Sequence, residues 1–192
     1  MSPDNRGFST LDLSGSRYTV EQSLIRNKYA AYDADGTVVL RAKQKLFELK
    51  EEFPFVDAED NEVFTVKASG ILDVAGTYAL VDAATGERVA ILDNDYSIFR
   101  DTWTIRDGQT EAALAKITSR GALVTLARNL FPLGELIPHK YEITDAEGGH
   151  VGHIDGQLSL RDTYDIVIDD AGNVPRDAVI AAAMVIDAIQ GN

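Results

Sequence analysis

The stretch that decides the fold lies at the end of the chain, where residues 174–192 read VPRDAVIAAAMVIDAIQGN. Nine of these residues, 178–186, are apolar without a break. Pro175 suits the first turn of a helix, and Gly191 can end one. Asp177 is favourable near the positive N-terminal end of a helix dipole. The flanks therefore predict a helix that begins near Pro175 and ends just before Gly191.

A membrane anchor and a helix buried in protein are the two interpretations of this segment. At about 1.5 Å per residue, a helix over residues 175–190 would be about 24 Å long, whereas the hydrocarbon core of a bilayer is roughly 30 Å thick. Asp187 would also be costly in lipid. A helix that is apolar on every side and spans no membrane must be surrounded by protein. We therefore predict a central helix whose buried residues are Val179, Ile180, Ala182, Ala183, Val185, Ile186 and Ile189.

The rest of the chain consists of short β-rich segments separated by turns that are rich in Asp, Asn and Gly. Asp and Asn bond their own backbone in turns, and Gly supplies positive φ angles. Regular spacing of this kind predicts a meander of hairpins, hence a mainly β sandwich or barrel. A run of alanines at residues 181–183 lets strands approach the helix axis closely, which favours a closed barrel. The β-rich segments are 18–25, 38–44, 62–68, 76–82, 87–93 and 139–145.

The chain also contains a repeat, because SIFRDTWTIRD at residues 97–107 is echoed by SLRDTYDIVID at residues 159–169. Repeats of this kind usually record a structural corner. We expect the Arg and Asp to close a bend between strands and the aromatic residue to point inward. A ligand pocket lined by the two aromatic residues is the alternative. The residues concerned are Arg100, Asp101, Trp103, Arg161, Asp162 and Tyr164.

Composition narrows the possible partners. The formal net charge of -13 at pH 7 opposes binding to nucleic acid and to anionic membranes. An acidic protein of an ordinary cytosol is one interpretation. We favour a high-salt cytoplasm, because the acidic residues are spread over every turn and strong screening makes a dense acidic surface tolerable.

The absence of Cys excludes disulfides, thiolate metal sites and palmitoylation, and it fits an intracellular protein.

The N-terminal residues 1–15 lack the basic-then-apolar pattern of a signal peptide, and we expect a flexible lead there. Residues 16–192 are then expected to form a single domain. No stretch reaches the roughly 20 apolar residues of a membrane span. A cytoplasmic location, with peripheral membrane contact as an option, follows from these patterns.

In the order of these motifs, the chain resembles the LURP-one-related family, within the Tubby C-terminal-like and phospholipid-scramblase-like group. The similarity runs from about Arg17 to Ile189 and includes KLFELKEEFPFVDAEDNEVFTVKA at residues 45–68, both repeats and the terminal helix. The resemblance implies a closed antiparallel barrel of roughly twelve strands around the C-terminal helix. The acidic composition points to a haloarchaeal member. Tubby-like members bind phosphoinositides and scramblase-like members associate with membranes, but this chain lacks a Cys for acylation.

A basic stripe is the strongest candidate for ligand binding. Arg41, Lys43 and Lys45 alternate in LRAKQKL, so on a strand they share one face. Such a stripe in an acidic chain suits an anionic headgroup, and Arg26 and Lys28 would extend it if their hairpin lies beside this strand. The alternative is a solvated face that pairs with neighbouring acidic residues.

Two segments contain residue types that can bind metal ions, but we expect a metal site at neither. His150, His153 and Asp155 lie in HVGHID, but residues three apart on a strand face opposite sides unless a bulge intervenes. Asp33 begins DADG, which resembles the start of a calcium loop, but Gln44 stands where that loop needs a Glu. A hairpin turn is the expected structure there.

The sequence contains no phosphate loop, nucleophile elbow, dinucleotide fingerprint or paired-carboxylate signature, so we expect no catalytic residues and no cofactor. Three functions stay open. The first is a non-enzymatic binding or scaffold module that recognises a lipid headgroup or a protein partner. The second is a scramblase-like lipid-handling protein at the membrane surface. The third is an enzyme with a site at the rim of the barrel.

Overall fold

The computed structural model describes residues 7–11, 13–23, 28–42, 52–68, 76–96, 101–120, 140–157 and 163–190. These residues contain twelve strands and the helix α2 (Arg176–Gln190). The strands are β1 (Arg17–Ser23), β2 (Lys28–Tyr32), β3 (Val38–Ala42), β4 (Phe53–Val56), β5 (Glu62–Ala68), β6 (Thr77–Asp82), β7 (Arg88–Tyr96), β8 (Asp101–Asp107), β9 (Ala113–Ser119), β10 (Lys140–Asp145), β11 (His150–Gln157) and β12 (Thr163–Ile168).

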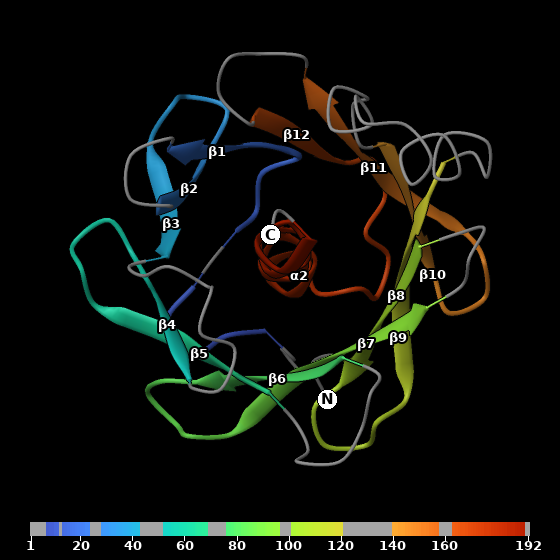
Figure 1. Ribbon diagram of the computed structural model, residues 1–192, viewed down its shortest axis with the longest axis horizontal. Helices are drawn as coiled ribbons and strands as arrows, with labels where there is room; N and C mark the ends of the chain where they lie inside the picture. Colours follow the sequence, from blue (N-terminus) through green and yellow to red (C-terminus); the bar gives the residue numbers. More distant parts are fainter. Residues whose placement is uncertain are drawn as a thin grey trace.

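The strands form one closed antiparallel barrel (Figure 1). Each strand pairs with its neighbours in sequence, and β1 pairs with β12 to close the ring, with Val20 opposite Tyr164. The helix α2 lies at the centre of the ring (Figure 1). The predicted mainly β barrel around a C-terminal helix is therefore confirmed, and the helix begins one residue after Pro175.

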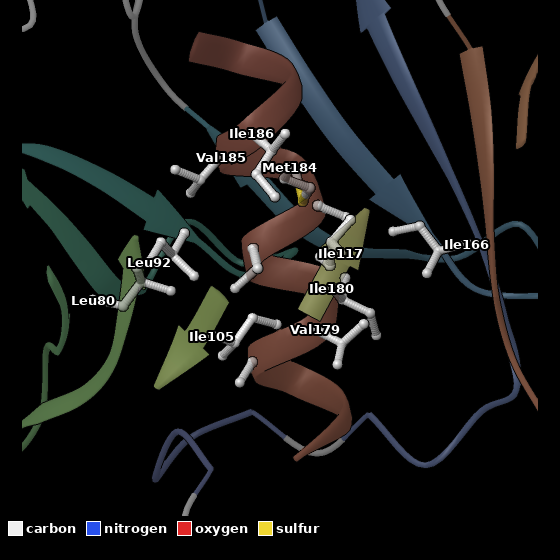
Figure 2. Packing of buried hydrophobic residues seen from close by; sticks show 14 of the residues in the cluster. Leu80, Leu92, Ile105, Ile117, Ile166, Val179, Ile180, Met184, Val185 and Ile186 are labelled. Carbon is white, nitrogen blue, oxygen red and sulfur yellow. The ribbon is translucent and has the colours of Figure 1, made fainter. Parts of the chain in front are cut away.

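The helix α2 fills the space that so many strands enclose. A barrel of about eight strands is filled by its own side chains, and a larger one leaves a lumen. Here the residues from Ala178 to Ile186 occupy that lumen, and none of them is more than 3% exposed. Figure 2 shows Leu80, Leu92 and Ile105 from the barrel wall directed at the helix. The unbroken apolar run thus has a wall of side chains on every side.

Five hairpin turns lie together at one end of the barrel, which we call the turn end. Each begins with an Asp whose Oδ1 accepts backbone amides of its own turn. Asp57, for example, accepts from Glu59 at 2.9 Å and from Asn61 at 2.8 Å. This chemistry explains why an Asp at the start of each turn marked a hairpin in the sequence. The turns are 33–37, 57–61, 82–87, 107–112 and 145–149.

A segment before β1 closes the turn end. Phe8 is 2% exposed, and its backbone N–H donates to Oδ2 of Asp177 at 2.5 Å. Ser9 binds the carboxylate of Asp82, and Leu13 is buried. Within the lead expected over residues 1–15, Phe8, Ser9 and Leu13 thus pack on the barrel, and the expected domain boundary at residue 16 stays a prediction. Their packing depends on acceptors far along the chain, which the local sequence does not reveal.

Candidate functional site

The interior of the barrel changes character toward the end opposite the turns, which we call the far end. There β2, β8 and β12 begin and β1, β7 and β9 end. The inward positions at this end carry aromatic and polar side chains, each two positions from an aliphatic residue of the core and so on the same face of its strand. All of them are buried. They are Tyr78, Asn94, Trp103, Tyr141 and Tyr164.

The two aromatic residues of the repeat belong to this layer. Trp103 is fully buried and packs at a tilt against Tyr78, with ring centroids 6.1 Å apart. Tyr164 donates a hydrogen bond from its hydroxyl to the backbone oxygen of Ala183 in α2, at 3.3 Å. Both rings belong to the buried core, and the hydrogen bond of Tyr164 connects the barrel wall to the helix.

The first Asp of the repeat lies at the start of β8. The backbone N–H of Asp101 donates to Oγ of Ser119 at 3.1 Å, and the hydroxyl of Tyr141 donates to its carboxylate at 3.5 Å. Asp101 thus joins β8 to β9 and β10 at the far end. The partner residues Arg100, Arg161 and Asp162 lie outside the described residues, so the expected Arg–Asp corner stays a prediction.

One corner of the far-end layer retains unused hydrogen-bonding groups. Asn94 and Trp103 face each other in the pairing of β7 with β8. The side-chain oxygen of Asn94 and the indole Nε1 of Trp103 are both buried, and neither has a hydrogen-bond partner in the part of the chain that the structure describes. Sequence reasoning did not single out Asn94, because an Asn near a strand end reads as a turn residue.

Arg41, the stripe residue whose side chain the structure describes, makes contacts that stabilise the fold. The guanidinium of Arg41 donates to the backbone oxygens of Asp57 and Ala58, at 3.1 and 2.6 Å, and pairs with Asp60 at 3.2 Å. Arg41 therefore braces the turn between β4 and β5, in line with the alternative that the basic residues pair with neighbouring acidic residues. β2, which begins at Lys28, pairs with β3, as the stripe hypothesis required.

The other predicted stripe residues are Lys43, Lys45 and Arg26, and they lie outside the described residues. Lys28 opens β2, and nothing further is described of its side chain. In the central helix, Val179, Ile180, Ala182, Ala183, Val185 and Ile186 are all buried, whereas nothing is described of the side chain of Ile189.

The histidines of HVGHID form a charged cluster on the outer face at the turn end. His150 contacts Glu142 through Nδ1 at 2.5 Å and Asp169 through Nε2 at 2.8 Å. His153 also approaches Asp169, at 3.7 Å. The two histidines share a face because a bulge in β11 skips Val151 in the pairing with β10. The bulge that the sequence left open is therefore present.

The cluster is a salt-bridge network. Carboxylates only accept hydrogen bonds, so a His150 ring bonded to two carboxylates carries a proton on both nitrogens. The hydrogen bonds to Asp169 and Glu142 raise the pKa of His150 above its ordinary value. Partial burial would raise the pKa of Glu142, but hydrogen bonds from His150 and Arg120 outweigh it and hold that pKa below its ordinary value. Among the described residues, no group of three or more His, Asp or Glu is arranged to hold a metal ion.

The buried carboxylates at the turn end also act as acceptors. Asp82 is 1% exposed and binds Ser9, Ala84 and Thr85. Burial alone would raise the pKa of Asp82, but the hydrogen bonds from Ser9 and Thr85 dominate and lower it. A carboxylate held ionised in this way is a poor general acid. Its chemistry is that of a fixed acceptor for backbone amides.

Comparison with known proteins identifies the family. The sequence model described as LURP-one-related matches residues 38–187, which is most of the chain. The chain belongs to the LURP-one-related family. The matched region begins at β3 and ends within α2, so it contains most of the central helix and most of the barrel wall.

The fold of this LURP-one-related protein is also that of a solved structure. An X-ray structure of an Arabidopsis thaliana protein superposes with a TM-score of 0.57 over 98% of both chains, at 10% sequence identity. At that identity the likeness shows a shared Tubby-like barrel fold and nothing about activity. No curated protein sequence matches the chain significantly. Among the described residues, no helix combines the length and the hydropathy that crossing a bilayer requires.

Proposed function

We propose that this LURP-one-related protein is a non-enzymatic binding module that recognises its partner on the outside of the barrel. The observation that carries the proposal is the filled lumen, in which no residue from Ala178 to Ile186 is more than 3% exposed. A substrate site needs a concave space with converging polar groups. An interior occupied by apolar side chains leaves recognition to the outer surface and the rims.

The far end is the side on which we place the contact with the partner. At the turn end several carboxylates are already bonded to their own turns, as Asp57 and Asp145 illustrate. The basic stripe candidates Lys43 and Lys45 follow β3, which runs toward the far end. An anionic lipid headgroup is the ligand that we place there, and a protein partner is the alternative outcome of the test.

Co-sedimentation with vesicles tests this assignment. The purified chain is mixed with neutral vesicles and with vesicles that contain anionic lipid, at low and at high salt. We expect binding to anionic vesicles that weakens with salt and is lost in the double variant Lys43→Glu/Lys45→Glu. The matched control is Lys116→Glu/Lys140→Glu, which changes the net charge equally at two exposed positions on β9 and β10.

The outcomes separate the possible partners. Loss of binding in the stripe variant, with binding retained in the control, supports a headgroup site at the stripe. Equal loss in both variants indicates attraction by overall charge and contradicts a specific site. The absence of binding at every salt concentration directs the search to a protein partner.

A high-salt cytoplasm, as in haloarchaea, is the setting that we propose for this module. The net charge of -13 supports it, because self-repulsion of that size is relieved by screening. The midpoint of thermal unfolding should then rise steadily with KCl into the molar range. A midpoint that is insensitive to salt would contradict this setting.

A further inference from the structure

We propose that the turn end of the barrel carries a recognition site for an extended peptide that reads Gly-aromatic-Ser, and that residues 7–9 fill this site as an intramolecular ligand. The site is made by Phe64 on β5, Asp82 at the end of β6 and Asp177 in the first turn of α2. It lies at the opposite end of the barrel from the proposed lipid contact, so the two proposals stand or fall separately.

The first position of the ligand accepts only glycine. A Cβ atom on Gly7 would lie 2.3 Å from Oδ2 of Asp177, well inside van der Waals contact. Asp177 cannot easily move away, because its Oδ1 accepts the backbone N–H of Ala178 at 2.9 Å and its side chain is buried at the start of α2. The carboxylate therefore selects for a residue without a side chain.

The second position is read as an aromatic ring. Phe8 stacks on Phe64 with ring centroids 4.5 Å apart and planes 18° from parallel. Phe64 stacks in turn on Phe55, at 4.5 Å and 12°. Phe8 is thus the last ring of a three-ring stack whose other two members belong to the barrel wall. Stacked rings add attraction beyond the area that they bury, which favours an aromatic residue here.

Two buried carboxylates bind the backbone amides of the ligand segment and the side chain of its third residue. Asp177 accepts the backbone N–H of Phe8 at 2.5 Å, and Asp82 accepts the backbone N–H of Ser9 at 2.7 Å. The hydroxyl of Ser9 also donates to Asp82, at 2.9 Å. Hydrogen bonds from consecutive amides together with side-chain pockets are how proteins recognise extended peptides. Charged acceptors make these bonds stronger than neutral ones.

The receptor groups belong to regular elements of the fold and not to the ligand segment. Phe55, Phe64 and Asp82 belong to the barrel wall, and Asp177 belongs to α2. The ligand segment belongs to neither a strand nor a helix. A second chain that presents Gly-aromatic-Ser would therefore meet the same groups. Because the whole chain carries a charge of -13, a partner with basic residues beside this tripeptide would associate fastest.

The test is binding of a peptide in trans to the full-length chain. The fluorescently labelled peptide NRGFSTLDL, residues 5–13, is titrated into the wild type and into the variant Phe8→Ala. The linked segment of the wild type competes at an effective concentration of the order of millimolar. We expect the variant to bind the peptide about tenfold or more tightly than the wild type does, and its thermal midpoint to rise toward the wild-type value as peptide is added.

Control peptides and a second variant make the result decisive. The same peptide with Gly7→Val or Phe8→Ala should not bind. If Phe8→Ala does not fold, Gly7→Ala weakens the docked segment by steric overlap while leaving every barrel group intact. A variant that unfolds cooperatively but binds no peptide at millimolar concentration would overturn the proposal, and so would equal binding of the Gly7→Val peptide.

Discussion

The two ends of this barrel are built from different chemistry. At the turn end, hairpins fold around their own aspartates, and a segment before β1 is fastened to Asp82 and Asp177. At the far end, the inward layer consists of aromatic rings and Asn94, and two of its polar atoms are unpaired within the described chain. The connections on this side lie mostly outside the described residues.

The difference separates the bracing of the hairpin turns from the proposed lipid contact. A turn whose Asp satisfies its own amides has few groups left for a ligand, and it holds two strands in register. Buried polar atoms without partners lower stability and are kept only where something else is gained. We therefore expect substitutions of the turn aspartates to change the free energy of unfolding, and substitutions of Lys43 and Lys45 to change binding to anionic vesicles.

The largest expected effect comes from the helix that joins the two ends. Ala182→Asp places an unpaired charge among fully buried side chains and should cost more than about 4 kcal/mol, which prevents folding. Ala112→Asp, at an exposed turn position, is the control and should fold normally. Circular dichroism and urea titration measure both. A cooperatively folded Ala182→Asp chain would refute the central helix.

The next effect distinguishes two turn aspartates. Asp82→Ala removes the acceptor of Ser9, Ala84 and Thr85 at a buried position and should cost about 2–3 kcal/mol. Asp57→Ala removes a similar turn acceptor at a half-buried position beside exposed turn residues, so its amides can bond to water and the loss should be clearly smaller. Urea unfolding gives both values. Equal losses would mean that docking of the N-terminal segment adds nothing to the role of Asp82.

Substitutions at two matched turn positions should change the stability by smaller amounts and in opposite directions. Gly86 and Glu111 occupy the same place in the two six-residue turns, with φ of 71° and 60°. Gly86→Ala should cost about 1 kcal/mol, because an L side chain disfavours this backbone. Glu111→Gly should gain up to about 1 kcal/mol, since its exposed ion pair with Arg88 contributes little. Two changes of the same sign in thermal unfolding would contradict the assignment.

The smallest effect is a dependence on pH at the outer cluster. Folding raises the pKa of His150, so protonated His150 stabilises the folded protein. This stabilisation is complete below about pH 6.5 and is lost as the pH rises through the pKa of His150 in the folded protein. The hydrogen bond from His150 lowers the pKa of Asp169, so ionised Asp169 also stabilises the folded protein. This stabilisation is present above about pH 4 and is lost on acidification.

The variant His150→Gln should therefore be less stable than the wild type at pH 6, with the difference shrinking by pH 9. His153→Gln, which removes an imidazole farther from Asp169 on the same face, is the control. The groups that face this ring are Glu142 on β10, His153 on β11, Asp169 after β12 and Arg120 after β9, which bonds to Glu142. A difference that grows with pH would contradict the salt-bridge account.

The fold was predictable because its signals are local. An apolar run with no polar face, from Ala178 to Ile186, has few possible environments, and the turn aspartates mark hairpins by bonding their own amides. Strands between such turns pair in sequence order, so the meander follows almost automatically. The resemblance to the LURP-one-related family rested on the same order of motifs.

The contacts that were not predictable are long-range. Phe8 and Ser9 find acceptors 169 and 73 residues away, and nothing in a short polar segment announces such partners. The shared face of His150 and His153 depends on a bulge, which reverses the alternation that a regular strand would impose. Arg41 matched a basic stripe in the sequence, but a turn brought nearby by strand pairing takes its guanidinium.

Native-state hydrogen exchange of α2 tests the central claim most directly. If the helix is the core of a closed barrel, the amides from Val179 to Ile186 exchange only when the whole protein unfolds, with the free energy obtained from urea titration. The amides of Phe8 and Ser9 should exchange through a smaller, local opening. Exchange of the α2 amides at rates well above global unfolding, with the strands still protected, would contradict a barrel built around its helix.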